Sequence, residues 1–450
     1  MQPSDQPPRH QPPPDRPLPG RSTAGESVPG QPPPGRAESA AGRQLRLWAE
    51  ALAAAVAPLV AMAAVAALGL WAAGAGALPE GAFPYVVAAT VLLAVGVPLD
   101  LTGTAAFVAQ ARGGITGLPL SVTLVGALVA GAVFLRPLRH RALVGPVELA
   151  GRAVRTALLW LALLLLVRQF AQHTFTVPTG DSLLDQLGTI FGGAPTVGFR
   201  AAPAATVGIG LAWLCGVLLL AFLIARRAPL PRHLLRLHAT VRPAGHAVLT
   251  LLTGYVLVGL VAGLASAATD GHPRDTIAVL LLALPNLAWI ALGVGIGGSW
   301  HGHSAGTIGL PVPEPLASVL RASRTRDVTL DLSSLSQQDG RSWLLLALAV
   351  VMVLLTGVGA ALHSPDRLPL WRYALNLAVA LAVGMLAIGL LTTVSAEFGL
   401  SLLGLDSGAG GLHLSPDLLV TVPLGVLWGA VAGLLGGLLT RGRPRRTGPT

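Results

Sequence analysis

Long apolar runs separated by short polar connections make up most of the chain. A run of about 18 apolar residues is long enough to cross the hydrocarbon core of a bilayer as a helix. A β-barrel would instead show alternating segments of about ten residues. The pattern therefore predicts an all-α, polytopic transmembrane helix bundle with about 8–10 membrane segments. Ten runs are identified, at residues 48–73, 83–99, 118–135, 153–167, 204–225, 244–268, 276–298, 343–362, 373–392 and 417–439.

Composition supports a membrane protein and excludes a soluble one. Of the 450 residues, 53% are hydrophobic and only 11% are charged, whereas soluble domains have about 25% charged residues. The net charge of +10 does not indicate a nucleic-acid partner, because the basic residues form short clusters beside the apolar runs, which is typical of charges that set topology. We expect a multi-pass protein of the cell membrane whose partner is the lipid bilayer.

Three regions follow from these patterns. Residues 1–46 are rich in Pro, Gly and Ser and bury too little apolar surface to offset the entropy of ordering, so we expect a disordered Pro-rich cytoplasmic tail. Residues 47–440 form the polytopic membrane domain. Residues 441–450 form a basic cytoplasmic C-terminal tail.

Arginine clusters predict the orientation of the chain. The positive-inside rule places them, and with them both termini, in the cytoplasm. Three apolar runs separate the first two clusters and five separate the last two, so one run in each half enters and leaves on the same side unless a cluster is misassigned. The clusters are Arg43 with Arg46, RPLRHR at 136–141, RRAPLPRHLLR at 226–236, and RGRPRR at 441–446.

The stretch LLAVGVPLDLTGT at residues 92–104 interrupts the second apolar run. Proline removes a helical hydrogen bond and kinks a helix, and an ionised carboxylate in the membrane is costly. We therefore predict a broken or re-entrant element over about 83–112, in which Pro98 ends a partial helix and Asp100 faces a protein-lined polar cavity. The alternative is that Asp100 marks the end of a span in the headgroup region.

The second half contains a corresponding interruption. LPNLAW at residues 284–289 places Pro285 and Asn286 in the middle of an apolar run, and the Gly-rich stretch 398–411 competes for the same role. Asn286 is either part of a polar membrane site with Asp100 or a hydrogen-bond partner between helices.

Two landmarks suggest an internal repeat. Trp213 and Arg226 recur 215 residues later as Trp428 and Arg441, and each pair closes the fifth apolar run of its half. We expect two five-segment halves, at 47–227 and 242–440, as in many transporters.

The sequence contains no motif that indicates an enzyme. It has no GxxxxGK[ST] or HExxH, and GVGIGG at residues 293–298 ends an apolar run, where helix packing is the expected role. His301 and His303 have no third ligand at useful spacing for a metal. We predict no catalytic residue, no cofactor and no metal, and a homo-oligomer or membrane protein partner bound through Gly-rich helix faces.

Two stretches resemble the streptophobe family of very hydrophobic polytopic proteins from high-GC bacteria. They are LPLSVTLVGALVAGAVFLRPLR at residues 118–139 and LPNLAWIALGVGIGG at residues 284–298. The family has no established activity, so the resemblance implies membrane residence and layout but no functional residue. Actinobacterial permease-like proteins share the same Leu-Pro-Asn break and are the alternative resemblance.

Two classes of function follow from these features. The first is a permease or transporter of unknown substrate, with Asp100 and Asn286 as its polar membrane site. The second is a non-transporting membrane scaffold or partner subunit, in which the same residues only hold helices together. The breaks in both halves favour transport.

Overall fold

The computed structural model describes residues 40–78, 81–105, 109–137, 146–176, 196–224, 232–269, 271–305, 328–338, 340–364, 369–402 and 405–441. The chain divides into Met1–Arg46 and Leu47–Thr450, and apart from residues 40–46 the structure described below belongs to the second unit. Most of the predicted N-terminal tail, Arg226, and the last nine residues lie outside the described ranges.

Each of the ten apolar runs overlaps a helix, and the molecule is mostly helical. Eight of the described helices are long and apolar enough to cross a membrane, which confirms the coarse prediction of an integral membrane protein; α2 and α3 are shorter. The ten helices are α1 (Ala40–Ala72), α2 (Ala82–Val95), α3 (Leu120–Leu135), α4 (Pro146–Phe170), α6 (Pro203–Ile224), α7 (Arg232–Thr269), α8 (Pro273–Gly295), α11 (Trp343–Leu362), α12 (Leu370–Thr392) and α13 (Leu418–Arg441).

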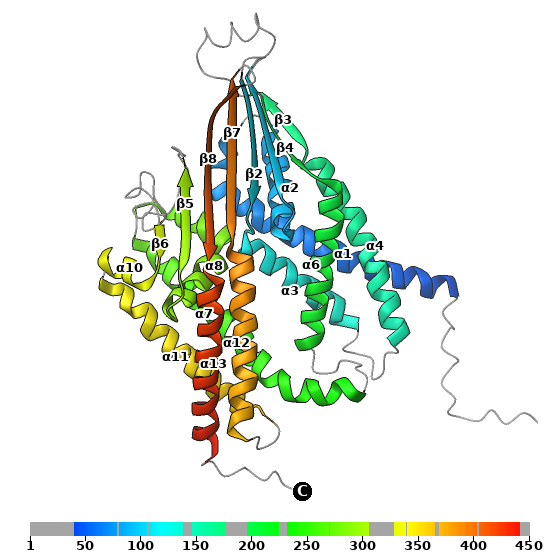
Figure 1. Ribbon diagram of the computed structural model, residues 1–450. Coiled ribbons are helices and arrows are strands. Elements are labelled where there is room, and N and C mark those ends of the chain that lie inside the picture. The colour runs from blue at the N-terminus through cyan, green and yellow to red at the C-terminus, as the bar shows by residue number, and fades with distance from the viewer. Residues whose placement is uncertain are drawn as a thin grey trace, which may run out of the picture. The chain divides into compact units, whose positions relative to one another are not determined.

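The prediction of an all-α fold is wrong in one respect, because eight segments of the described residues form one antiparallel sheet. Its strand order is β3-β4-β1-β2-β7-β8-β5-β6, and Figure 1 shows the strands gathered at one end of α12 and α13. The strands are β1 (Leu99–Ala105), β2 (Ala109–Thr116), β3 (His173–Thr176), β4 (Thr196–Ala201), β5 (Trp300–Ala305), β6 (Val328–Leu330), β7 (Val394–Leu402) and β8 (Leu405–Pro416).

The predicted broken element at 83–112 is instead a helix followed by a hairpin. α2 ends at Val95, and Gly96 terminates it in the left-handed conformation, with φ of 98°. β1 then pairs with β2 from Leu99 onward, so the chain returns to the start of α3. The reason is that LDLTGT alternates apolar and polar residues, which suits a strand with one covered face. Residues 398–411, the competing candidate, fall in the β7–β8 hairpin.

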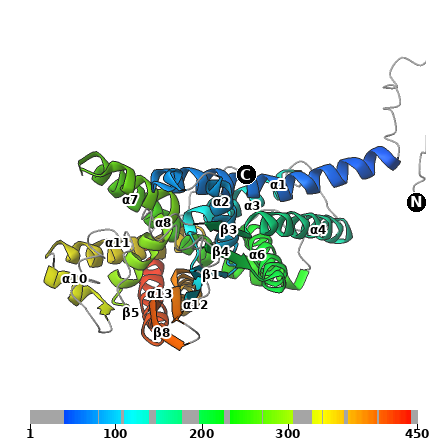
Figure 2. The same ribbon diagram turned by 90° about the horizontal axis from the view of Figure 1, so that it is seen from above.

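Among the residues that the structure describes, the buried hydrophobic side chains form two clusters. Every buried member of the first lies between Ala54 and Leu218, and every buried member of the second lies between Ala244 and Ala432. In the view from above, α4 and α6 lie on the side of β3 and β4, whereas α10 (Leu332–Gln338) and α11 lie on the side of β5 (Figure 2). The hydrophobic core is therefore divided between the two parts of the chain.

Glycines allow the closest helix contacts. A Cβ added at Gly429 would lie 2.6 Å from the Cα of Ala378, and one at Gly433 would lie 2.5 Å from the carbonyl oxygen of Tyr373, both in α12. Gly263 of α7 likewise packs on Leu280 of α8. At these three glycines the close contacts are therefore made within the chain itself.

Candidate functional site

The strand register places polar side chains on one face of the sheet. Residues directly opposite each other on paired strands point to the same face, and Asp100 lies opposite both Arg200 and Gly114. The register places exposed polar residues from all eight described strands on this one face, which we call the polar face. Its exposed members are Thr174, Arg200, Asp100, Thr102, Arg112, Thr116, Glu397, His413, His301, His303 and Thr329.

The opposite face of the sheet is apolar and covered near the helices. Leu99, Ala201 and Trp300 are at most 4% exposed. The Trp300 ring occupies space beside Gly293 of α8, where an added Cβ would lie 2.0 Å from it. This packing fixes the lower end of the sheet on the helices and leaves the polar face outward.

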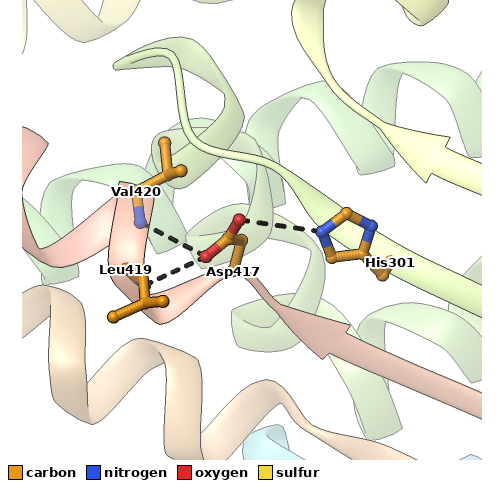
Figure 3. A network of polar contacts seen from close by, with 4 residues as sticks. All are labelled: His301, Asp417, Leu419 and Val420. Carbon is orange, nitrogen blue, oxygen red and sulfur yellow. Dashed lines mark hydrogen bonds and ion pairs between the residues drawn. The ribbon is translucent and has the colours of Figure 1, made fainter.

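A small polar network lies where the polar face meets α13 (Figure 3). Asp417 immediately precedes α13, and its Oδ1 accepts hydrogen bonds from the N–H groups of Leu419 (3.0 Å) and Val420 (3.3 Å). Its Oδ2 lies 3.8 Å from Nε2 of His301. Asp417 thus caps α13, as acidic residues do at helix N-termini, and also connects the helix to β5.

Asn286 performs a structural task in α8. Its Oδ1 accepts a hydrogen bond from the Leu120 N–H (3.0 Å), and its Nδ2 donates to the Leu118 carbonyl (2.9 Å). The side chain is buried, at 9% exposure. The amide therefore satisfies backbone groups at the start of α3, which a helix N-terminus cannot satisfy by itself.

Ser121 makes the matching connection from α3 to α8. Its hydroxyl donates to the Leu280 carbonyl (2.9 Å) and accepts from the Leu284 N–H (3.1 Å). The hydroxyl therefore bridges two backbone groups of α8 that are four residues apart, and the second of them, Leu284, directly precedes Pro285. The predicted interruption at 284–289 is thus not a break, because α8 continues through Pro285 with Ser121 satisfying its backbone.

The structure does not unite the two predicted site residues in one polar network. Asp100 is exposed on β1, in the middle of the sheet, whereas the Asn286 amide is bonded to the backbone of residues 118–120. On the polar face, Arg200 of β4 lies opposite Asp100. Thr102, two residues further along β1, lies opposite Arg112 of β2.

Sequence reasoning missed most of the polar face. Arg112, Arg200, Glu397 and His413 were not singled out, although the alternation in TVGFRA (196–201) and LHLSP (412–416) carries the signal. Among the described residues, no group of three or more His, Cys, Asp or Glu side chains is arranged to hold a metal ion. The candidate site is therefore a broad exposed surface.

Comparison with known proteins adds no relative. No family model matches the chain, and neither a curated protein nor a solved structure matches it.

Proposed function

We propose that this integral membrane protein is a non-transporting scaffold or partner subunit that binds a folded protein outside the cytoplasm through the polar face. The observation that carries the proposal is the exposed row of Asp100, Arg112, Arg200, Glu397 and the histidines across one sheet. The face contains both charge signs, which suits a protein surface of mixed charge. A nucleic acid would require a uniformly basic surface.

The orientation follows from the ends of three helices. α3, α6 and α13 each begin directly after a strand of the sheet and end beside an arginine cluster. The positive-inside rule assigns those clusters to the cytoplasm, so the sheet lies on the outer side. In this proposal the end of α13 puts the C-terminus in the cytoplasm, and Arg43 with Arg46 predict the same side for the N-terminus.

Transport is the weaker alternative. A transport path through Asp100 and Asn286 needs both side chains in one polar cavity at membrane depth. Asn286 already makes an accepted and a donated hydrogen bond to α3, and Asp100 is exposed on a strand. These placements favour the scaffold, and no step of the proposal needs an enzyme, a cofactor or a metal. Streptophobe membership stays a prediction.

The proposal includes a tandem repeat of two five-helix halves. In chain order, the described part of each half has two helices, a hairpin, two helices, a second hairpin and a final helix; α10 is an addition in the second half. In the sheet, β3-β4-β1-β2 of the first half is followed by β7-β8-β5-β6 of the second. Because β3, β4, β1 and β2 correspond to β7, β8, β5 and β6, the same strand order occurs twice.

Matching local details support the repeat. α2 and α8 both lead into a glycine with positive φ, Gly96 (98°) and Gly297 (99°). In each case the glycine N–H donates to the carbonyl three residues earlier, and the next N–H donates to the carbonyl five residues before it. This is the Schellman pattern. A strand begins three residues after each glycine.

The last helices of the halves also pack alike. Gly210 of α6 and Gly425 of α13 lie 215 residues apart, the spacing of Trp213 and Trp428. An added Cβ at Gly210 would lie 2.5 Å from Leu164 of α4, and one at Gly425 would lie 2.9 Å from Met385 of α12. Each final helix thus receives a large side chain from the helix before its hairpin.

Site-specific photocrosslinking in intact cells tests the docking function. A photoreactive residue at Thr102 or His413 on the polar face should give the same protein adduct from either position. The adduct should be lost when Arg112→Glu and Glu397→Arg are combined, because reversed charges no longer complement the partner. A probe at Leu219 of α6, which is 71% exposed on the helices, is the control and should give no such adduct.

The same experiment separates docking from transport. If the polar face gives no adduct, or an adduct unaffected by charge reversal, the docking proposal is wrong. Under the transport alternative, Asp100→Leu alone abolishes solute uptake. Under the docking proposal, that single change weakens the adduct by only a few-fold, since one residue contributes a fraction of a broad interface.

A further inference from the structure

We infer that the outer strands of the sheet join copies of this chain head to tail, β6 of one copy pairing with β3 of the next. The inference rests on the repeat proposed above but not on the docking of a partner protein. In the described sheet, β3 and β6 are the two outermost strands. An outer strand presents backbone groups that can pair with another chain.

The junction in the middle of the sheet supplies the template. There β2 of the first half pairs with β7 of the second, in an antiparallel register from Ala109 opposite Leu402 to Thr116 opposite Ser395. By the repeat, β2 corresponds to β6 and β7 corresponds to β3. The outer strands are therefore the same two kinds of strand that already pair inside one chain.

The register of the proposed contact follows from the strand pairs. Leu99 lies opposite Ile115 and its equivalent Trp300 lies opposite Leu330, so Leu330 corresponds to Ile115. On the other side, β4 and β8 correspond at a spacing of 215 residues. His173 lies opposite Phe199 and Val394 lies opposite Leu414, so His173 corresponds to Val394.

These equivalences give chemically compatible cross-strand pairs. The internal pair Ile115 and Ala396 becomes Leu330 opposite Phe175, two residues of apolar type. The internal pair Gly114 and Glu397 becomes Thr329 opposite Thr176. Apolar pairs and threonine pairs both stabilise adjacent strands.

The membrane restricts how such contacts can continue. A head-to-tail contact is heterologous, so it leaves one outer strand of each kind available for the next copy. All copies have the same orientation in the bilayer, so neighbours are related by rotation about the membrane normal or by a flat translation. The assembly is therefore a ring or a row of chains with one continuous extracytoplasmic sheet.

Cysteine crosslinking between differently tagged chains tests the contact, in the full-length protein with Cys215→Ser. One chain carries Thr176→Cys and the other carries Thr329→Cys, and both are produced in the same membrane. We expect an oxidised product that contains both tags, and a double variant should give a ladder of multimers. Gly114→Cys with Glu397→Cys is the positive control, because these residues are opposite within one chain. Thr329→Cys with Thr102→Cys, on an inner strand, is the negative control.

Two outcomes would overturn the inference. One is no crosslink between chains while the internal control closes normally. The other is crosslinking of Thr329→Cys only to itself, which indicates a two-fold symmetric contact. Charge variants provide a second measurement: Thr176→Glu with Thr329→Glu should lower the assembled fraction in lipid nanodiscs by about fivefold. Thr176→Arg with Thr329→Glu should restore it; equal assembly of both variants contradicts the proposed register.

Discussion

Individual polar residues in the membrane domain serve mainly to satisfy backbone groups. Asn286 and Ser121 bond to carbonyl and N–H groups of the facing helix, and both lie in the stretches that carried the family resemblance. The sequence predicted Asn286 as either a membrane site or a helix–helix partner, and the structure places it in the second role. Periodicity reveals that a residue is buried, but not which distant backbone it meets.

Asn286→Ala should lower thermal stability markedly. The substitution leaves the buried Leu120 N–H and Leu118 carbonyl without their partner, which costs about 1–3 kcal/mol. Thr250→Ala is the matched control, because that exposed hydroxyl bonds only to His246 of its own helix. Melting of the detergent-solubilised protein, followed by size-exclusion fluorescence, should rank Asn286→Ala well below the control. Equal melting temperatures would contradict the structural role.

At the scale of elements, the helices were predictable and the strands were not. Runs such as 343–362 and 373–392 have enough apolar length to be recognised without any partner. The strands lie in short connections rich in Gly and Thr, where LDLTGT and WHGHSA alternate over only six residues. Such hairpins need neighbouring strands to become stable. Some of the paired strands lie hundreds of positions apart in the chain, and a local sequence pattern does not show which strands pair.

Gly96→Ala and Gly297→Ala should each destabilise the protein by about 1 kcal/mol, because a Cβ is disfavoured at their positive φ. An added Cβ has room at both positions, 3.4 Å from Ile209 and 3.7 Å from Leu424, so the cost arises from the backbone. Gly208→Ala, in open space within α6, is the control and should be neutral or stabilising. Chemical or thermal denaturation of the three variants compares them directly; similar stabilities would refute the cap assignment.

Asp331 should stabilise the start of α10 in a pH-dependent way. Although burial raises the pKa of Asp331, hydrogen bonds from the Ser334 N–H and the Ser333 hydroxyl lower it below its ordinary value of 3.8. A lowered pKa means that the stabilisation is complete above pH 3.8 and is lost as the pH falls through the folded-state value. Asp331→Ala should cost about 0.5–2 kcal/mol at pH 7, and the difference from wild type should shrink below pH 4. A difference that stays constant to pH 3 would exclude the carboxylate as the cause.

At the scale of the whole molecule, the sequence predicted a helical membrane domain and expected two halves. It did not predict that hairpins from both halves form one sheet, because local composition does not indicate that β2 pairs with β7. This architecture accounts for the odd number of apolar runs between the first two arginine clusters. The apolar run at residues 83–99 contains α2, which has only 14 residues, and the β1–β2 hairpin then returns the chain to the start of α3.

The sheet should be accessible from outside the cell. Thr102→Cys and Thr329→Cys, both exposed on the polar face, should react with a membrane-impermeant maleimide in intact cells when Cys215 is replaced. Arg136→Cys, exposed at the opposite end of α3, should react only after permeabilisation. The reverse result would invert the orientation and move the polar face into the cytoplasm.

The division of the hydrophobic core has a consequence for how the chain is made. Every buried member of the first cluster precedes residue 219, so that half can pack before the ribosome has synthesised the second. Domains of a growing chain commonly fold in this order. The second half would then fold against the already folded first half. In this step β7 pairs with β2, and Asn286 forms its hydrogen bonds with the backbone at the start of α3. Chains 1–231 and 232–450 made separately in one membrane should therefore find each other and reassemble.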